Sequence, residues 1–189
     1  DYLVAEQNSK KEHFLDLVDL VNSNTKKSEE ESLEIVKKFS IQIQNKLSNN
    51  LNEVSQIFTS LEDVSHNQPI YLSKVPFISL CEHHLLPFFG TFDMAIFPET
   101  KIAGISKFSD LINHLSYDLT LQEKITKQAA EIIQNELNAQ GVLVRIIAKH
   151  LCSDLMNPRS SISDVITTFS TGIYELDYSL RAEALTNFK

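Results

Sequence analysis

The chain of 189 residues lacks several features that would assign a protein to a class at once. It contains no long apolar run and no charged segment followed by an apolar leader, so we expect neither a membrane span nor a signal peptide. Positive charge is scarce, because 17 lysines and arginines face 25 aspartates and glutamates, which gives a net charge of −8. This balance argues against nucleic acid or an anionic membrane as a partner, and an anionic substrate would need local positive charge.

Cysteine is scarce as well, and both cysteines have histidine neighbours. One cluster is Cys81-Glu-His-His84, and the other contains His150 and Cys152. Two cysteines permit a single disulfide, which would be typical of a secreted protein, and free cysteine is otherwise often buried. The histidine neighbours favour unpaired thiols in a reducing compartment, so we expect a cytoplasmic protein.

The spacing of these residues is compatible with one metal ion. Cys81 and His84 can reach the same metal from a tight turn or a strand end, and Cys152 can supply a third ligand. Two thiolates and one imidazole suit Zn²⁺, and three protein ligands leave a fourth position for water, as in catalytic zinc sites. The spacing alone leaves a disulfide and ordinary buried thiols open as alternatives.

The first third of the chain has a helical pattern. Apolar residues recur at helical spacing from Phe14 to Val21, and Ser28 with Glu31 forms a capping box that predicts a helix to Leu47. A third short helix is expected over residues 52–61, and turn residues follow at 66–69. We therefore expect a helical extension over residues 1–66 and a catalytic domain over residues 67–189.

The remainder has a mixed pattern. We expect strands over residues 70–80, 88–97, 142–148 and 164–174, and helices over residues 106–115, 120–137 and 177–185. Gly141 is expected to end the second of these helices. The order strand–strand–helix–helix–strand–strand predicts an α+β fold, an antiparallel sheet with two helices packed on one face.

Four segments carry a resemblance to a known family. Residues 79–90, Ser-Leu-Cys-Glu-His-His-Leu-Leu-Pro-Phe-Phe-Gly, closely resemble the zinc-binding motif of GTP cyclohydrolase I. Gly104-Ile-Ser-Lys107, Leu121-Gln-Glu-Lys-Ile-Thr126 and Lys149-His-Leu-Cys152 resemble three further motifs of that family, in the same order and at matching spacings. The resemblance implies a tunnelling fold, in which the sheets of several subunits join edge to edge around a barrel. It also implies a homodecamer of two stacked pentamers, with active sites between subunits.

The resemblance assigns roles to the cysteines and histidines of the two clusters, and we call the three proposed ligands among them the metal cluster. It implies that Cys81, His84 and Cys152 bind zinc, which activates water to attack C8 of a guanine nucleotide. It implies that His150 is the general acid and base and that His83 is a second catalytic histidine. If the strand continues to Cys152, His150 and Cys152 point to the same face. The alternative for His83 is a histidine that only supports a ligand.

The resemblance also assigns residues that bind the nucleotide. Glu123 and the adjacent Gln122 match the pair that binds guanine, since a carboxylate can accept two hydrogen bonds from the base. The alternative for Glu123 is structural, because Thr120-x-x-Glu123 is itself a capping box. Ser106 and Lys107 match substrate-binding positions, with Lys107 as a cation for phosphate.

The chain departs from the family where arginines hold the triphosphate. Asp110 and Met156 stand at two such positions, and arginine is not replaced there conservatively. The expected reaction is the zinc-dependent conversion of GTP to dihydroneopterin triphosphate with release of formate, a step of pterin and folate synthesis. Two alternatives remain: a zinc hydrolase for a related purine that lacks the triphosphate, and a binding or regulatory protein without activity.

Overall fold

The computed structural model describes residues 14–48, 54–59, 61–63, 66–156 and 164–188. The chain divides into two compact units, Asp1–Asn49 and Asn50–Lys189. The division expected after residue 66 separates a helical from a mixed part of the sequence, and it stays a prediction. Within the described ranges, no helix has both the length and the apolar character that a membrane crossing requires.

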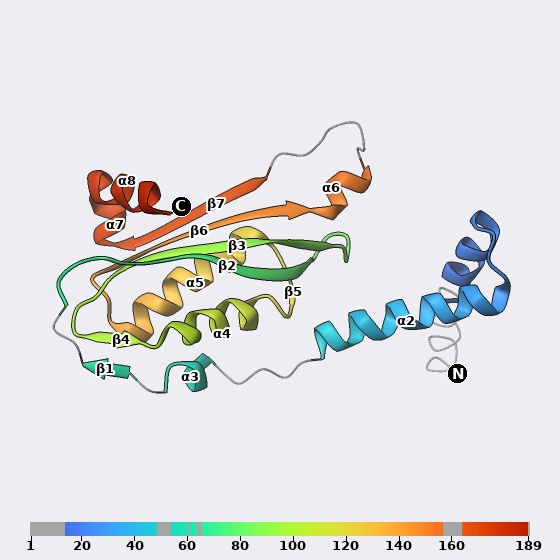
Figure 1. Ribbon diagram of the computed structural model, residues 1–189, viewed down its shortest axis with the longest axis horizontal. Coiled ribbons are helices and arrows are strands. Elements are labelled where there is room, and N and C mark those ends of the chain that lie inside the picture. Colours follow the sequence, from blue (N-terminus) through green and yellow to red (C-terminus); the bar gives the residue numbers. More distant parts are fainter. Residues whose placement is uncertain (1–13, 49–53, 60, 64–65, 157–163, 189) are drawn as a thin grey trace, which may run out of the picture. The chain divides into compact units, whose positions relative to one another are not determined.

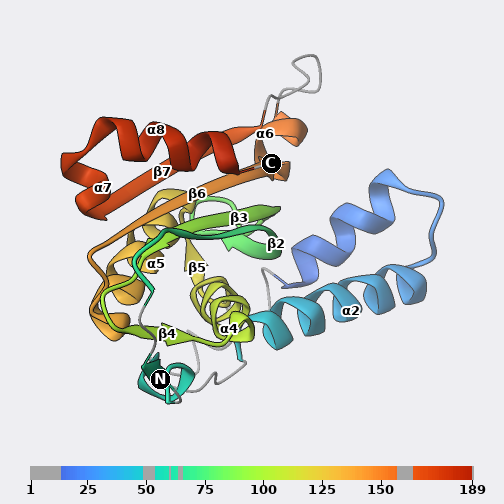
Figure 2. The same ribbon diagram turned by 60° about the vertical axis from the view of Figure 1, so that its left-hand side comes forward.

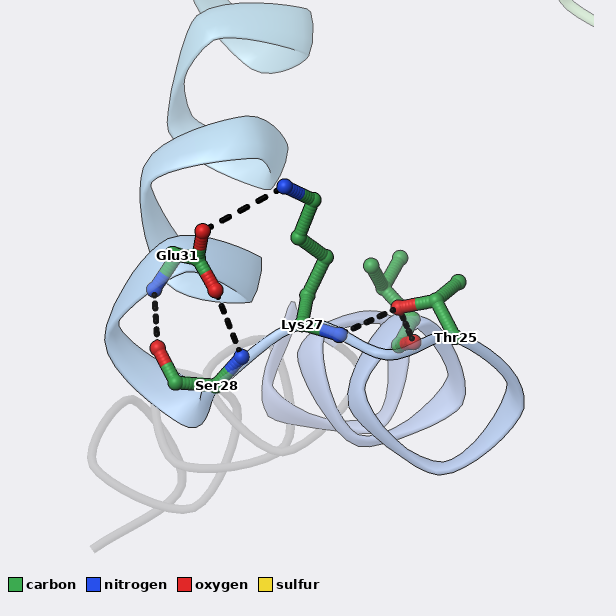
Figure 3. A network of polar contacts seen from close by, with 5 residues as sticks. Thr25, Lys27, Ser28 and Glu31 are labelled. Atoms are coloured by element: carbon green, nitrogen blue, oxygen red, sulfur yellow. Dashed lines mark hydrogen bonds and ion pairs between the residues drawn. The ribbon is translucent and has the colours of Figure 1, made fainter.

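The described residues of the first unit are mostly helical. Residues 14–24 are helical, and α2 (Glu29–Leu47) follows after a short turn. The predicted capping box is present: Glu31 N donates to Ser28 Oγ at 3.2 Å, and Ser28 N donates to Glu31 Oε2 at 2.8 Å (Figure 3). Lys27 adds an ion pair of 3.3 Å with Glu31. These contacts satisfy the first backbone N–H groups of α2, so the helix begins where the sequence predicts.

The second unit is built around a five-stranded sheet with the order β5-β2-β3-β6-β7. Its strands are β2 (Ile70–Cys81), β3 (Pro87–Phe97), β5 (Leu119–Thr120), β6 (Gly141–His150) and β7 (Val165–Gly172). All neighbouring pairs are antiparallel except β2 with β5, which are parallel. A separate pair joins β1 (Leu61–Asp63) to β4 (Lys101–Ala103).

Two long helices cover one face of this sheet, as Figure 1 shows. They are α4 (Ile105–Leu115) and α5 (Gln122–Leu137), and their apolar sides share one core with inward-facing residues of β2, β3 and β6. The core residues with no exposed surface include Phe88, Phe92, Leu111, Ile125 and Ile146. The order β2-β3-α4-α5-β6-β7, with two helices packed on one face, confirms the predicted α+β fold of the chain, and the joining of several such sheets around a barrel stays a prediction.

Among the described residues of this unit, α7 (Ile173–Leu176) and α8 (Tyr178–Asn187) cover part of the opposite face (Figure 2). Tyr174 and Phe188 pack there against β3 and β6 in a second apolar cluster. Beside it, Asp93 on β3 and Arg145 on β6 form a largely buried ion pair of 2.7 Å, and Arg145 also donates to the Phe188 carbonyl. The C-terminal helix is therefore fixed to the middle of the sheet.

Three local predictions are wrong. Within the helix expected over residues 52–61, the described residues include the short α3 (Val54–Ile57), and Leu61 begins β1 instead, while residues 52, 53 and 60 lie outside the described residues. Asn138, in the left-handed conformation, ends α5, whereas Gly141 begins β6. Strand β6 ends at His150, and α6 (Leu151–Met156) follows directly. Cys152 therefore does not share a strand face with His150.

Candidate metal and catalytic site

The first cluster lies in the turn that joins β2 to β3. Cys81 is the last residue of β2, and its carbonyl accepts from Leu85 N at 2.9 Å while its own N–H donates to the Leu86 carbonyl at 2.9 Å. Leu85 has a φ of 57°, a left-handed conformation that leucine rarely adopts. This tight turn folds His84 back, so that its Nδ1 lies 3.9 Å from Cys81 Sγ.

The second cluster meets the first from α6. The ligand atoms of Cys81, His84 and Cys152 all lie within 4.8 Å of one another. The cysteines are buried and free, and the histidine is exposed at the turn. The disulfide alternative is therefore not realised, and the residues predicted from spacing come together although Cys152 reaches the cluster from a helix.

The donor set fits a metal ion. Burial raises the pKa of the Cys152 thiol, and the neighbouring Cys81 raises it further through repulsion between their negative forms. A cation placed between two such sulfurs removes both penalties, because it compensates their charge in a buried setting. Two soft sulfurs and one imidazole nitrogen form a set that could hold a metal, with room for a further ligand.

His150 ends β6 beside the metal cluster. The β3–β6 register pairs it with Phe88, and the two rings stack with centroids 4.7 Å apart and an angle of 4°. Its Nε2 lies 2.9 Å from Gln122 Oε1. Burial lowers the pKa of the His150 imidazole, and the charge of Glu123 opposes part of that shift. A half-buried histidine held on its face and at one nitrogen is oriented for proton transfer.

The start of α5 places Gln122 and Glu123 in different surroundings. Gln122 is 1% exposed and its side-chain amide is bound within the protein, whereas the Glu123 side chain is exposed. Leu121 is the N-cap residue of α5, and no side chain caps the helix. The capping-box alternative for Glu123 is therefore not realised, and its carboxylate is available to other partners.

Contacts between the β2–β3 turn and α5 hold the two sides of the site together. Glu82 N donates to the Thr120 carbonyl at 3.1 Å, and Lys124 forms an ion pair of 2.6 Å with the Glu82 carboxylate. The two-residue strand β5 pairs with the end of β2 directly before this point. Sequence reasoning missed Phe88, Lys124 and the Gln122–His150 contact. Of these, only Phe88 had a signal in the sequence, because it is a large apolar residue that closely follows the first cluster along the chain.

The remaining predicted residues lie at the surface. His83 is exposed, and its ring centroid lies 5.9 Å from that of His84. Ser106 and Lys107 lie in the first turn of α4, after the N-cap Gly104. Lys107 and Asp110 line a cavity of about 300 Å³, together with Gln56, Ile57, Asn113, His114 and Tyr117. We call it the α4 cavity. No residue of the metal cluster lines it, so the chain by itself does not join the two places.

Comparisons with known proteins identify a family and several relatives of the chain. A family model described as GTP cyclohydrolase I matches residues 12–189. The chain is 40% identical over 125 residues to GTP cyclohydrolase 1 of Clostridioides difficile (strain 630), a stretch that covers 66% of each chain. It is 38% identical over 134 residues to GTP cyclohydrolase 1 of Fusobacterium nucleatum, which covers 71% of this chain and 72% of the relative. The matched stretch thus spans about two thirds or more of each relative.

Proposed function

The chain belongs to the GTP cyclohydrolase I family, a family of enzymes, and we propose that it is a zinc-dependent hydrolase acting on GTP. The reaction adds water at C8 of guanine and opens the imidazole ring, and a second water releases C8 as formate. Carbons of the ribose then close a new ring with loss of one water, which gives dihydroneopterin triphosphate for pterin and folate synthesis. The observation that carries the proposal is the convergence of the Cys81, His84 and Cys152 ligand atoms within 4.8 Å.

Three side chains are the proposed zinc ligands, and the proposed task of the zinc ion is to activate water. Cys81, His84 and Cys152 would hold the zinc ion, with the two sulfurs supplied by separate segments of the chain. When bound, zinc supplies the Lewis acidity that activates water near neutral pH. The buried position of both cysteines keeps bulk solvent away from the sulfurs and strengthens their interaction with a cation.

The histidines carry the proton transfers. His150 takes a proton from the attacking water and returns it to the ring nitrogen that leaves C8, a task that suits a neutral imidazole. Its half-burial and the stack on Phe88 support this role, since both restrict the ring to one orientation. His83, exposed beside His84, assists as the second catalytic histidine at the open side of the turn.

Substrate binding falls to residues at the starts of α5 and α4. The exposed carboxylate of Glu123 accepts hydrogen bonds from the N–H groups of guanine, as charge-assisted pairs. Ser106 and Lys107 bind the phosphate end, where the first turn of α4 adds backbone N–H groups that no side chain caps. For Gln122, a direct contact with the base stays a prediction, and its contacts within the chain favour the indirect role developed below.

The proposal includes assembly of several copies of the chain. The strand β7 forms one edge of the sheet, and the face beside it carries Phe89 (41% exposed) and Ile166 (60% exposed). Exposed edges and apolar faces of this kind are suited to pairing with other copies of the chain. A ring-based homodecamer would bring the α4 cavity of one subunit toward the metal cluster of another. Free cysteine ligands suit the reducing cytoplasm, and the acidic chain is not expected to bind nucleic acid or membranes.

A second candidate substrate is favoured by one observation. Asp110 is exposed in the α4 cavity beside Lys107, and its charge opposes a triphosphate there. A related purine with fewer phosphates would avoid this repulsion. Formate release measured with GTP, GDP, GMP and guanosine decides between the two. A preference for GTP supports the proposal, and equal or better use of GMP or guanosine supports the second candidate.

A further inference from the structure

The side-chain amide of Gln122 is enclosed by four hydrogen-bond partners. The two protons of its Nε2 are shared among three acceptors, the carbonyls of Ile146 at 3.1 Å and Val165 at 3.0 Å and Thr167 Oγ1 at 3.1 Å. Its Oε1 lies 2.9 Å from His150 Nε2. The first residue of α5 thus connects β6, β7 and the histidine, and no such task was evident from the sequence.

The orientation of this amide is fixed by its surroundings. Backbone carbonyls can only accept hydrogen bonds, so the NH₂ group has to face Ile146 and Val165. Turning the amide would place its oxygen against two carbonyl oxygens, which repel it, and would remove the hydrogen bonds that these carbonyls accept from Gln122. The oxygen of Gln122 therefore faces His150.

The threonine network leads to the same assignment independently. Thr126 Oγ1 donates its proton to the backbone carbonyl of Gln122, one helical turn earlier, at 2.7 Å. At the 2.6 Å contact between Thr126 and Thr167, the donor is then Thr167. With its proton used there, Thr167 can only accept from the Gln122 amide. Each hydroxyl proton has one place to go, and the NH₂ group of Gln122 again points away from His150.

An oxygen that faces a ring nitrogen requires a proton on that nitrogen. A neutral imidazole carries one N–H, so a proton on Nε2 leaves Nδ1 as the acceptor. We propose that Gln122 is a positioning residue that holds neutral His150 in the Nε2–H tautomer, which makes Nδ1 the atom that exchanges protons in the reaction. This inference rests on the function proposed for His150 and names the ring atom through which it acts. Gln122 then affects the reaction through His150, without touching substrate.

The tautomer can be measured directly in the zinc-loaded enzyme. Magic-angle-spinning NMR of protein labelled with ¹⁵N in the histidine rings distinguishes protonated from unprotonated nitrogens in an assembly of any size. The signals of His150 are assigned by their loss in His150→Ala. At mildly alkaline pH, we expect a protonated Nε2 and an unprotonated Nδ1 in the unaltered protein, as the hydrogen bonds of Gln122 require. A proton on Nδ1 would overturn the proposal without any Gln122 variant.

The variant Gln122→Met tests the cause, because it keeps the length of the side chain and removes its polar atoms. We expect a mixture of tautomers, a kcat at least about tenfold lower, and a KM for GTP changed by less than about threefold. The matched control is Thr167→Val, which removes one acceptor of the amide and leaves the oxygen facing His150. It should keep the tautomer and most of kcat. Zinc content is measured for each variant, so that loss of metal is recognised.

The outcomes separate this inference from the proposed function. An unchanged tautomer in Gln122→Met contradicts the positioning role. A raised KM with an unchanged kcat contradicts it too, because that pattern indicates a direct contact with the substrate. If the unaltered chain releases no formate from GTP, the proposed function fails, yet the tautomer of His150 and its dependence on Gln122 are still measured. Should Gln122→Met not fold, the spectrum of the unaltered protein alone decides the tautomer.

Discussion

The metal cluster and the α4 cavity differ in how firmly the fold holds their side chains. Cys81 and Cys152 are buried, and His150 is stacked on Phe88 and bound to Gln122. In the α4 cavity, by contrast, Lys107 is half-buried and Asp110 is exposed. The metal cluster is part of the core and its hydrogen-bond network, whereas the α4 cavity is a surface site lined by charged side chains.

This difference gives a physical reason for what the sequence resemblance implies, namely that the cluster motifs match the family while Asp110 departs from it. A change at the metal cluster would leave buried polar or charged groups without partners, which costs stability as well as chemistry. A change on the exposed side of α4 costs the fold little, since surface substitutions usually alter stability by less than about 0.5 kcal/mol. The charged side chains of the α4 cavity can therefore change without altering the catalytic residues. We expect substitutions at the metal cluster to affect activity much more than substitutions in the α4 cavity.

The largest effect is expected from Cys152→Ser. The substitution removes one of three ligands, and a hydroxyl is a poor substitute for a thiolate toward zinc. We expect the protein to lose its metal and its formate release to fall to background. Atomic emission measures the zinc and a formate assay the turnover. The neighbouring Ser153→Ala serves as the control and should retain about one zinc per chain. An active, metal-free Cys152→Ser protein would disprove the role of the cluster.

The next effect is expected from His150→Ala. A general acid and base contributes about a hundredfold or more to the rate, so kcat should fall by at least that factor. The zinc content and the oligomer should be unchanged, because His150 is not among the three ligands. The exposed His66, changed to alanine, controls for the loss of a histidine as such. Normal turnover by His150→Ala would leave the histidine with a structural role only.

A moderate effect is expected in the α4 cavity. Asp110→Arg exchanges a repelling charge for an attracting one, and the guanidinium can bind phosphate through two hydrogen bonds. Because the position is exposed, we expect the KM for GTP to fall by roughly three- to tenfold with kcat nearly constant, and the gain should shrink at high salt. Glu99→Arg, the same change of charge at another exposed position, should have little effect. Equal effects of the two variants would show that only net charge matters.

The smallest effect is expected far from both places, at Tyr174. Burial raises the pKa of its hydroxyl above the ordinary value of about 10. Among the described residues its hydroxyl has no hydrogen-bond partner. Tyr174→Phe should leave the free energy of unfolding within about 1 kcal/mol of the original near neutral pH.

The pH dependence of this variant has a defined sign. The raised pKa means that the folded state favours the neutral phenol, so its stabilising contribution is complete below the pKa of the unfolded state, about 10. That contribution is lost as the pH rises through the pKa of the folded state. Tyr174→Phe should therefore be the more stable protein above pH 10, in denaturant titrations repeated across that range. Identical alkaline profiles would contradict the assignment.

Local sequence signals predicted the elements whose causes are local. The capping box of Ser28 and Glu31 begins α2 as expected, because both partners lie within one turn. A similar pattern at Thr120 and Glu123 failed, since Thr120 pairs with Cys81 in β5 and is not available as a cap. The two cases differ only in tertiary surroundings, which a local pattern does not contain.

The candidate site was predictable in its ligands and not in its supports. Cys81, His84 and Cys152 are chemically distinctive, and their spacing is enough to suggest one metal. The path by which Cys152 arrives was mispredicted, because α6 begins directly after His150. Gln122 gave no signal of its task either. Its partners lie 24 to 45 positions further along the chain, and only the pairing of β6 with β7 brings them together.

The most direct test of zinc-dependent hydrolysis by this chain is formate release from GTP as zinc is returned stepwise to metal-free protein. We expect the rate to rise in proportion to bound zinc and to level off at about one zinc per chain. Cys152→Ser should stay at background throughout. Formate released at full rate before zinc is added, or none released when every chain holds zinc, would contradict the proposed role of zinc.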